Sequence, residues 1–360
     1  MTNWREQLTQ LFPALAHLSD DSYVVGGAIR DLLLGRTPAD ADVACLDPLT
    51  AARRVSPRVI RLGNQEHLSA YRVVLPNHIY DFAALLDGHI DADLARRDFT
   101  INAMAVDLRA DELLDPHGGQ RDVAARTVRM VRPENFDDDP LRTLKAIRMA
   151  VKYDFTIDDA TIAAIRSRAH RITEVATERV LYELTVILSS NALRKAVALF
   201  DATALAEPLG LHLRALHADE VPLAAALALL VDDPRASAER WRWSDALLHD
   251  VLALQHLVDH HDRIALFDAG ESVARQLPPL LRALGRDDAL DFPDFTTRAL
   301  LTGNEIAQLA NVPRGPELGA LKRALLEAQL RGEVVTRADA ERYVGESTVR
   351  PPAGRPGRQR

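Results

Sequence analysis

The chain has 360 residues, of which 47% are hydrophobic and 27% are charged, a balance typical of a soluble globular protein of two or three domains. Its 44 basic and 52 acidic residues give a net charge of −8, which excludes a protein that coats nucleic acid by bulk positive charge. The single cysteine, Cys45, excludes an internal disulfide framework and a cysteine-rich zinc site.

The start of the chain has helical rather than secretory character. Residues 1–20 place Trp4 and several leucines at helical spacing, without a basic start and an apolar block. The longest apolar run, 221–231, has 11 residues, whereas a membrane helix needs about 20. We therefore predict a cytoplasmic protein with no membrane partner, and the sequence leaves its oligomeric state open.

The first third of the chain alternates between short strand-like and short helical segments. Gly26 and Gly27 predict a turn, and the helix predicted for 28–34 is closed by Gly35. Segments rich in Val, Ile and Tyr predict strands at 23–25, 43–45, 59–62, 70–75 and 79–83.

Beyond residue 131 the pattern changes to apolar residues at three- and four-residue spacing, which predicts helices. The chain is thus predicted to have an α+β head followed by an all-helical remainder. Prolines divide the remainder, and the last residues are rich in Pro, Gly and Arg. The predicted parts are a head (1–131), a neck (132–205), a body (206–300), a tail (301–345) and a disordered basic terminus (346–360).

The segment 23–44 holds the most informative chemistry. Paired glycines between a strand and a helix let backbone amides approach an anion, and Arg30 lies one turn along that helix. Asp40 and Asp42 follow at the start of a strand, where the two-residue period places both carboxylates on one face. Such a pair can share the two cations of phosphoryl-transfer chemistry. Each feature alone also fits an ordinary turn or a solvated acidic pair.

Five motifs, in order, resemble the class II tRNA nucleotidyltransferase and bacterial poly(A) polymerase family over about half of the chain. The motifs are GGAIRDLLLG with the following DAD (26–42), DLARRDFTINAMA (93–105), DPHGGQRD (115–122), FDDDPLRTLKAIRMA (136–150) and ERVLYEL (178–184). A weaker match spans 301–344. The resemblance implies a polymerase-β-like nucleotidyltransferase head, with a small β-sheet and flanking helices, before the helical neck, body and tail. It also implies an enzyme that adds CMP, and possibly the terminal AMP, from CTP and ATP to the 3′ end of tRNA.

The resemblance assigns roles to individual residues of the head. Asp40 and Asp42 would hold Mg²⁺ as the catalytic pair, with Asp81 as a weak third candidate. The triphosphate would be bound by Gly26, Gly27, Arg30 and Arg97. On its own, the segment 96–98 also fits a local ion-pair cluster, and Asp81 equally fits a satisfied aspartate in a strand.

Further nucleotide-binding residues are implied in the neck: Asp139, Arg142, Lys145 and Arg148. Asp139 offers acceptors and Arg142 paired donors, so together they could bind the edge of cytosine or, after a shift, adenine. The alternative is that Asp139 caps a helix beginning at Pro140 while Arg142 makes a salt bridge. Lys145 stands where the family usually has Arg, and this difference leaves the role of Lys145 open. Asp138 stands where the family usually has Glu, which keeps the charge on a shorter side chain.

Other functions fit less well. His217, His249 and Asp288 allow a metal-dependent phosphohydrolase of the HD type, and a non-catalytic RNA-binding protein could share the fold. A poly(A) polymerase would carry a basic, aromatic stretch after the D-x-D strand, which the segment 61–74 lacks.

The link between Asp81 and Asp93 is short and contains no Arg, Lys or Tyr. Full CCA-adding members of the family have a longer flexible loop here, which is thought to help the pocket change from C to A. We therefore hypothesise a CC-adding enzyme, with a complete CCA-adding enzyme and an A-adding specialist as alternatives.

Overall fold

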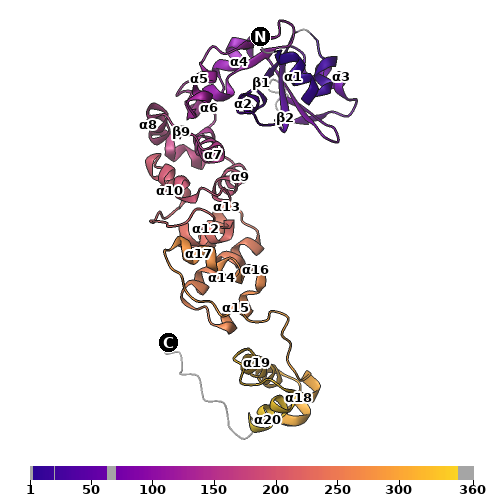
Figure 1. Cartoon of the computed structure of the whole chain (residues 1–360), viewed down its shortest axis with the longest axis vertical. Coiled ribbons are helices and arrows are strands. Elements are labelled where there is room, and N and C mark those ends of the chain that lie inside the picture. The colour runs from indigo at the N-terminus through magenta and orange to yellow at the C-terminus, as the bar shows by residue number, and fades with distance from the viewer. Residues whose placement is uncertain (1–2, 20, 63–69, 348–360) are drawn as a thin grey trace. The chain divides into compact units, whose positions relative to one another are not determined.

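The computed structural model describes residues 3–19, 21–62 and 70–347 (Figure 1). The chain forms two compact units. One runs to Arg214 and includes Glu239–Arg242, and the other comprises Ala215–Ala238 and the chain from Trp243 on. The boundaries predicted at 131, 205 and 300 stay predictions.

The head is built on a mixed seven-stranded sheet with the strand order β3-β4-β5-β2-β1-β6-β7. All neighbouring strands are antiparallel except β2 and β5, which are parallel. Strands predicted from the sequence account for five of these positions, whereas the three-residue strands β6 and β7 were not predicted. The bounds are β1 Ser22–Val25, β2 Asp40–Cys45, β3 Ile60–Leu62, β4 Ala70–Val74, β5 Ile79–Ala84, β6 Ala105–Asp107 and β7 Glu112–Leu114.

Helices flank this sheet and continue the first unit. The core of the head contains Val24, Val43, Tyr80 and Phe82, all of which are buried. The α-helices of the unit are α1 Trp4–Leu11, α2 Gly27–Leu33, α3 Pro48–Val55, α4 Ile90–Ala95, α5 Gly119–Ala124, α6 Asn135–Asp138, α7 Arg142–Tyr153, α8 Asp159–Arg168, α9 Thr177–Leu188, α10 Leu193–Ala202 and α11 Ala206–Leu209. Its 3₁₀ turns are η1 Pro13–His17, η3 Leu86–Gly88, η4 Thr100–Asn102 and η5 Ala169–Glu174.

The helical remainder is confirmed, with one exception of two residues. β9 (Thr156–Ile157) pairs in parallel with β8 (Thr127–Val128). Asp154 ends α7 in the left-handed conformation, with φ 56°, and the β-branched residues after it then lie extended beside the head. This short pairing connects the neck to the last strand of the head, which periodicity alone did not predict.

The second unit is entirely helical over its described residues. Its last three helices pack around a separate core that includes Ile306, Leu325 and Val344. The helices are α12 Leu223–Leu230, α13 Pro234–Trp241 (whose residues from Glu239 belong to the first unit), α14 Asp245–Asp259, α15 Arg263–Ala269, α16 Glu271–Ala274, α17 Leu277–Ala283, α18 Gly303–Ala310, α19 Pro316–Leu330 and α20 Arg337–Ser347.

Two predictions made from the sequence concern segments that the structure describes only in part. Glu346 and Ser347, which were assigned to the disordered terminus, belong to α20, and 348–360 lie outside the described residues. Half of the segment compared with poly(A) polymerases, residues 63–69 of 61–74, lies outside them as well. Within the described ranges, no helix combines the length and the apolar character that crossing a membrane requires.

Candidate nucleotide and metal site

The turn between β1 and α2 brings three predicted residues together. Gly26 has φ +78°, a conformation that favours glycine, and its amide donates to the Met104 carbonyl. A Cβ atom built there would lie 2.9 Å from Arg97 Nη1 and 3.4 Å from Asp42 Oδ2. A side chain at this position would therefore clash with the arginine, so glycine is required where the backbone, the cation and the carboxylate converge.

The two carboxylates of β2 lie on one face of the sheet, as predicted from their spacing. Asp40 is exposed and Asp42 is half-buried, with buried Ala41 between them. Burial raises the pKa of Asp42 from 3.8 to about 6; the negative charges of Asp40 and Asp81 add to this effect, and Arg97 and Arg72 oppose it. The raised pKa therefore reflects mainly the burial of the Asp42 carboxyl, which Arg97 offsets only in part.

Asp81 lies beside this pair because β5 runs parallel to β2, in a register that aligns Asp81 with Asp42. Arg72, on β4, donates to both of its oxygens, at 2.7 Å from Nε and 2.6 Å from Nη2. The structure thus shows Asp81 as a paired strand aspartate. Its role as a third metal ligand stays a prediction and would require Arg72 to release at least one oxygen.

The donor set fits a hard divalent cation whose coordination the substrate completes. Among the described residues, no three His, Cys, Asp or Glu side chains form a ready-made metal cage. Mg²⁺ is commonly bound through one or two carboxylates together with substrate phosphates and water. Asp40 and Asp42 supply such oxygens, and Asp81 adds a third carboxylate near Asp42.

The resemblance predicts that Arg30 binds phosphate, but its side chain is buried and already hydrogen-bonded within the protein. It is 7% exposed, and its guanidinium donates to Asp31 Oδ1, to Asn102 Oδ1 at 2.6 Å and to the Tyr153 hydroxyl at 2.5 Å. Its Nη2 also lies 3.3 Å from a Cβ position built at Gly27. Arg30 therefore ties α2 to η4 and α7 beneath the glycine turn, and phosphate binding, which stays a prediction, would require part of this network to open.

The arginines in DLARRDFT form a local ion-pair cluster, and triphosphate binding by Arg97 stays a prediction. The buried carboxylate of Asp93 accepts from Arg96 at 2.8 Å and from Arg97 at 3.0 Å, so the cluster is centred on Asp93, whereas Asp98 accepts from the Phe99 amide and from Asn102. The same cluster orients Arg97, because its Nε and Nη2 face Asp93 while its Nη1 lies at the glycine turn. Asp93 was not predicted to have this positioning role.

The motif 136–150 of the neck, to which the resemblance assigns base selection and which we call the selecting motif, is attached to the head through Arg142. Its Nη1 donates to the Arg96 carbonyl at 2.8 Å and to the Asn135 carbonyl at 3.0 Å. Buried Asn135 in turn donates to the carbonyls of Ala95 and Arg97. Arg142 makes no salt bridge with any residue that the structure describes, so the expected alternative is corrected: the side chain is anchored by carbonyls, with its other nitrogens left available.

Asp139 does not cap a helix that begins at Pro140, because α7 begins at Arg142 with Leu141 as its N-cap. Its Oδ2 accepts from Arg179 Nη2 at 2.9 Å, and its Oδ1 accepts a longer bond of 3.3 Å from the Leu141 amide. Asp139 and Arg142 are thus held separately, by α9 and by the head.

The other two predicted cations of α7 differ from each other. Half-buried Lys145 has no ion pair within the described ranges, whereas Arg148 Nε lies 2.6 Å from Oε2 of buried Glu183. Glu183 and Arg179 both come from ERVLYEL, whose individual residues had no predicted role. Charged residues four apart on an otherwise apolar helix were the available signal.

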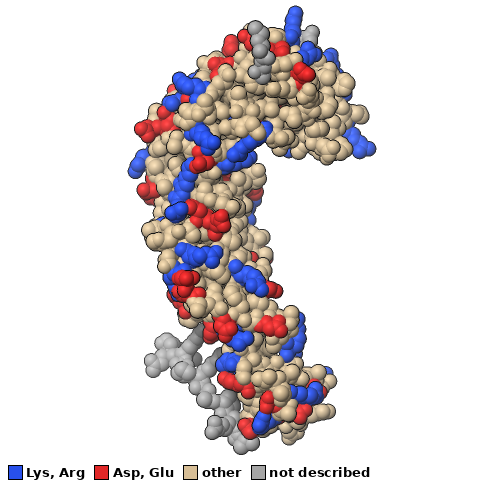
Figure 2. All heavy atoms as spheres, viewed as in Figure 1, with Lys and Arg blue, Asp and Glu red and all other residues tan. Residues whose placement is uncertain are grey.

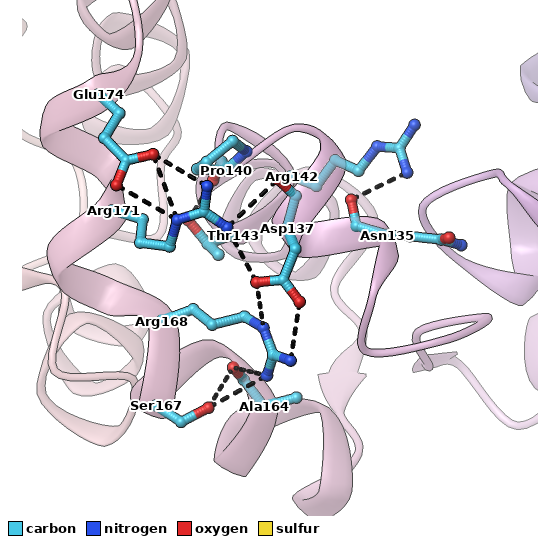
Figure 3. A network of polar contacts seen from close by, with 10 residues as sticks. All are labelled: Asn135, Asp137, Pro140, Arg142, Thr143, Ala164, Ser167, Arg168, Arg171 and Glu174. Atoms are coloured by element: carbon cyan, nitrogen blue, oxygen red, sulfur yellow. Dashed lines mark hydrogen bonds and ion pairs between the residues drawn. The ribbon is translucent and has the colours of Figure 1, made fainter.

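Asp137 anchors α6 to the following helices (Figure 3). Both of its oxygens accept from Arg168, at 2.9 and 3.0 Å, and Oδ1 also accepts from Arg171, which is paired with Glu174. The hydrogen bonds from Arg168 lower the pKa of Asp137 below its ordinary value of 3.8. Asp137 thus positions the selecting motif without belonging to the site.

We expect Asp137→Ala to lower the melting temperature at neutral pH. Because the folded-state pKa is lowered, this stabilisation is fully present above the unfolded value of 3.8 and is lost as the pH falls through the folded-state pKa. Thermal unfolding of wild type and variant between pH 2 and 7 measures the difference. Asp138→Ala is the matched control, since the exposed side chain of Asp138 makes no ion pair within the described part of the chain. Equal losses in both variants would contradict the anchoring role.

The residues proposed for a phosphohydrolase do not gather in the second unit. His217 packs against Gly285, His249 contacts only the adjacent Asp250 at 3.5 Å, and Asp288 pairs with Arg286. The described residues therefore give no support to that alternative.

Basic side chains do not form one continuous area on the face shown in Figure 2, where blue and red atoms are interspersed. Many arginines are engaged by neighbouring carboxylates, such as Arg323 by Asp268 and Glu327. In the described part of the chain, cations without an acidic partner, such as Lys145, are therefore those whose charge is not neutralised by a neighbouring carboxylate.

Family models match both parts of the first unit. Residues 22–85 and 50–129 match the Poly A polymerase head domain, and residues 154–216 match a model described as a probable RNA and SrmB-binding site of polymerase A.

Individual relatives match nearly the whole chain. A CC-adding tRNA nucleotidyltransferase of Geobacter sulfurreducens is 31% identical, with 96% of each chain covered. An A-adding tRNA nucleotidyltransferase of Deinococcus radiodurans is 29% identical, with 92% of this chain and 96% of the relative covered. The solved structure of the Bacillus stearothermophilus CCA-adding enzyme in complex with CTP has the same fold, with a TM-score of 0.76 at 23% identity over 97% of this chain and 98% of that one. The names of these proteins include three different specificities.

Proposed function

Because the chain belongs to the tRNA nucleotidyltransferase and poly(A) polymerase family, we propose that it transfers CMP from CTP to the 3′ end of tRNA. The observation that supports this most is the convergence of Gly26, Asp42 and Arg97 at one turn. The selecting motif is joined to the same place, since Arg142 donates to the Arg96 carbonyl. The proposed phosphate site and the proposed base-recognition site would thus form one assembly.

In the proposed reaction, the RNA 3′ oxygen bonds to the α-phosphorus of CTP while the bond to the leaving pyrophosphate breaks. The glycine turn and Arg97 would bind the triphosphate, with Asp93 holding Arg97 in place. Asp40 and Asp42 would hold Mg²⁺. Bound Mg²⁺ would lower the pKa of the attacking hydroxyl and neutralise phosphate charge.

Cytosine would be selected by Asp139 and Arg142, which we call the base-selecting pair. Cytosine offers the acceptors O2 and N3 and the donor N4, which match an arginine and a carboxylate, whereas uracil and guanine place an acceptor against the carboxylate. The nitrogens of Arg142 that are not bonded to backbone carbonyls can donate to O2 and N3. Oδ1 of Asp139, which accepts only one long bond, can accept from N4.

We further propose that the enzyme adds C-C and adds the terminal A poorly. The connection from β5 to α4 runs only from Leu85 to His89 and is folded into the 3₁₀ turn η3. Backbone bonds hold it, from Leu85 to the Cys45 carbonyl and from His89 to the Leu86 carbonyl. So short a connection has no length to act as the lever that shifts the base-selecting pair toward adenine.

The test uses tRNA that ends before its first C, with CTP alone, ATP alone or both, and products sized on a denaturing gel. We expect two added nucleotides with CTP and no efficient third addition when ATP is also present. Addition of three nucleotides at similar rates would show a CCA-adding enzyme and overturn the C-C proposal.

Two further substrates separate the other members of the family. Addition of a single A, limited to tRNA ending in C-C, would show an A-adding enzyme. Long A tracts on unrelated RNA would show a poly(A) polymerase, and no transfer to any RNA would contradict the proposed function as a whole.

A further inference from the structure

Tyr182 on α9 is the only exposed Phe, Tyr or Trp side chain within the described ranges, with 64% of its surface accessible. A tyrosine ring left in water forgoes a large hydrophobic gain, so its exposure requires a reason. The exposure of Tyr182 is not caused by loose packing of α9. The opposite face of the helix is buried through Val180, Glu183, Leu184 and Ile187.

Tyr182 lies one helical turn from Arg179, the residue of α9 that contacts the base-selecting pair. Tyr182 is three residues beyond Arg179, so the two side chains are neighbours on one face. Arg179 donates to Oδ2 of Asp139 at 2.9 Å. The exposed aromatic face is therefore one helical turn from the side chain that holds the selecting carboxylate.

Cations of α7 lie alongside. This helix packs against α9 and presents Arg142, Lys145 and Arg148 at three-residue spacing on its less buried side. Arg148 is neutralised by Glu183, whereas Lys145 has no acidic partner in the described part of the chain. An exposed aromatic ring and an unpaired cation on two helices that pack together are the combination that binds single-stranded nucleic acid, since the ring stacks on a base and the cation attracts the backbone.

We propose that Tyr182 is a stacking platform for the base of the 3′-terminal nucleotide of the RNA. The incoming nucleotide is already accommodated, with its triphosphate at the glycine turn and its base edge at the base-selecting pair. An RNA end has to enter from solvent and shift after each addition, which suits a ring that is open to solvent and stacks on any base. This inference rests on the proposed function.

The test compares Tyr182→Ala and Tyr182→Phe with Leu46→Ala. Leu46 is 61% exposed in the same unit, just after the end of β2 that is remote from Asp40. We expect Tyr182→Ala to raise the KM for tRNA about tenfold, in the range of a lost base–aromatic stack, with KM for CTP unchanged. Tyr182→Phe keeps the ring and stays within about twofold of wild type. All three variants retain the wild-type melting temperature, because both side chains are exposed.

Three kinetic outcomes would overturn the platform: an unchanged KM for tRNA in Tyr182→Ala, a rise in KM for CTP instead, or equal damage from Phe and Ala. Fluorescence anisotropy with labelled tRNA separates this inference from the proposed function. Weaker binding by Tyr182→Ala in a protein that transfers no CMP would support the platform and contradict only the reaction. A wild-type protein that binds no tRNA would overturn both.

Discussion

Asp42→Asn is expected to abolish CMP transfer and, at the same time, to make the metal-free protein more stable above pH 6. The loss of activity follows from removing one of two carboxylates that would share the metal. Metal ions contribute several kcal/mol of charge stabilisation in such transfers, so we expect turnover to fall by about 10³-fold or more.

The gain in stability follows from the pKa of the same carboxyl. Its folded-state value of about 6 exceeds the ordinary 3.8, so the folded protein holds a proton that the unfolded chain releases. Below about pH 4 the carboxyl of Asp42 is protonated in both states and does not lower the free energy of unfolding. Between about pH 4 and pH 6 the free energy of unfolding falls as the pH rises, and above about pH 6 this loss stays constant. A neutral asparagine removes it, which we expect to be worth about 1–3 kcal/mol at pH 8.

The two effects are measured by CTP incorporation and by thermal unfolding with a chelator present, at pH 4 and pH 8. Added Mg²⁺ should raise the melting temperature of wild type but not of Asp42→Asn. Asp87→Asn is the control, since Asp87 is an exposed carboxylate with φ 51°, a conformation that asparagine tolerates. Near-normal turnover in Asp42→Asn would refute the metal assignment, and an unchanged melting temperature at pH 8 would refute the electrostatic cost.

Asp139→Ala is expected to reduce the preference for CTP over UTP by about 10²-fold, because a site built on hydrogen bonds discriminates through the polar groups that a wrong base leaves unpaired. Without the carboxylate, the uracil O4 no longer faces an acceptor. Arg179→Ala should have the same sign and a smaller effect, since it frees Asp139 to rotate without removing it. Binding of tRNA should change less than selectivity in both variants.

Single-turnover incorporation of each nucleotide, expressed as the ratio of kcat/KM values, measures this preference. Asp138→Ala is the matched control, because it removes the adjacent carboxylate and leaves the pair with Arg179 intact. If Asp139→Ala kept wild-type selectivity and lost only thermal stability, the carboxylate would serve the ion pair with Arg179 alone.

Local conformational preferences were sufficient to predict five strands of the head sheet and the first residues of the candidate site. The two-residue period of β2 places Asp40 and Asp42 on one face whatever surrounds them. A glycine in the left-handed conformation between a strand and a helix is likewise a local requirement at Gly26. The short strands β7 and β9 show no clear period, and the sequence did not predict them.

What the sequence determined by itself was which residues carry the chemistry: the glycine turn, the paired carboxylates and the charged motifs in their order. Only the tertiary structure decided what each side chain meets. Asp81 lies beside Asp42 because two strands far apart in sequence pair in parallel, and Arg72 then engages both of its oxygens. Arg30 faces inward because α7 packs over α2 and supplies Tyr153. Hydrogen bonds and ion pairs act over a few ångströms, so a partner that is distant in sequence is settled only when the chain has folded.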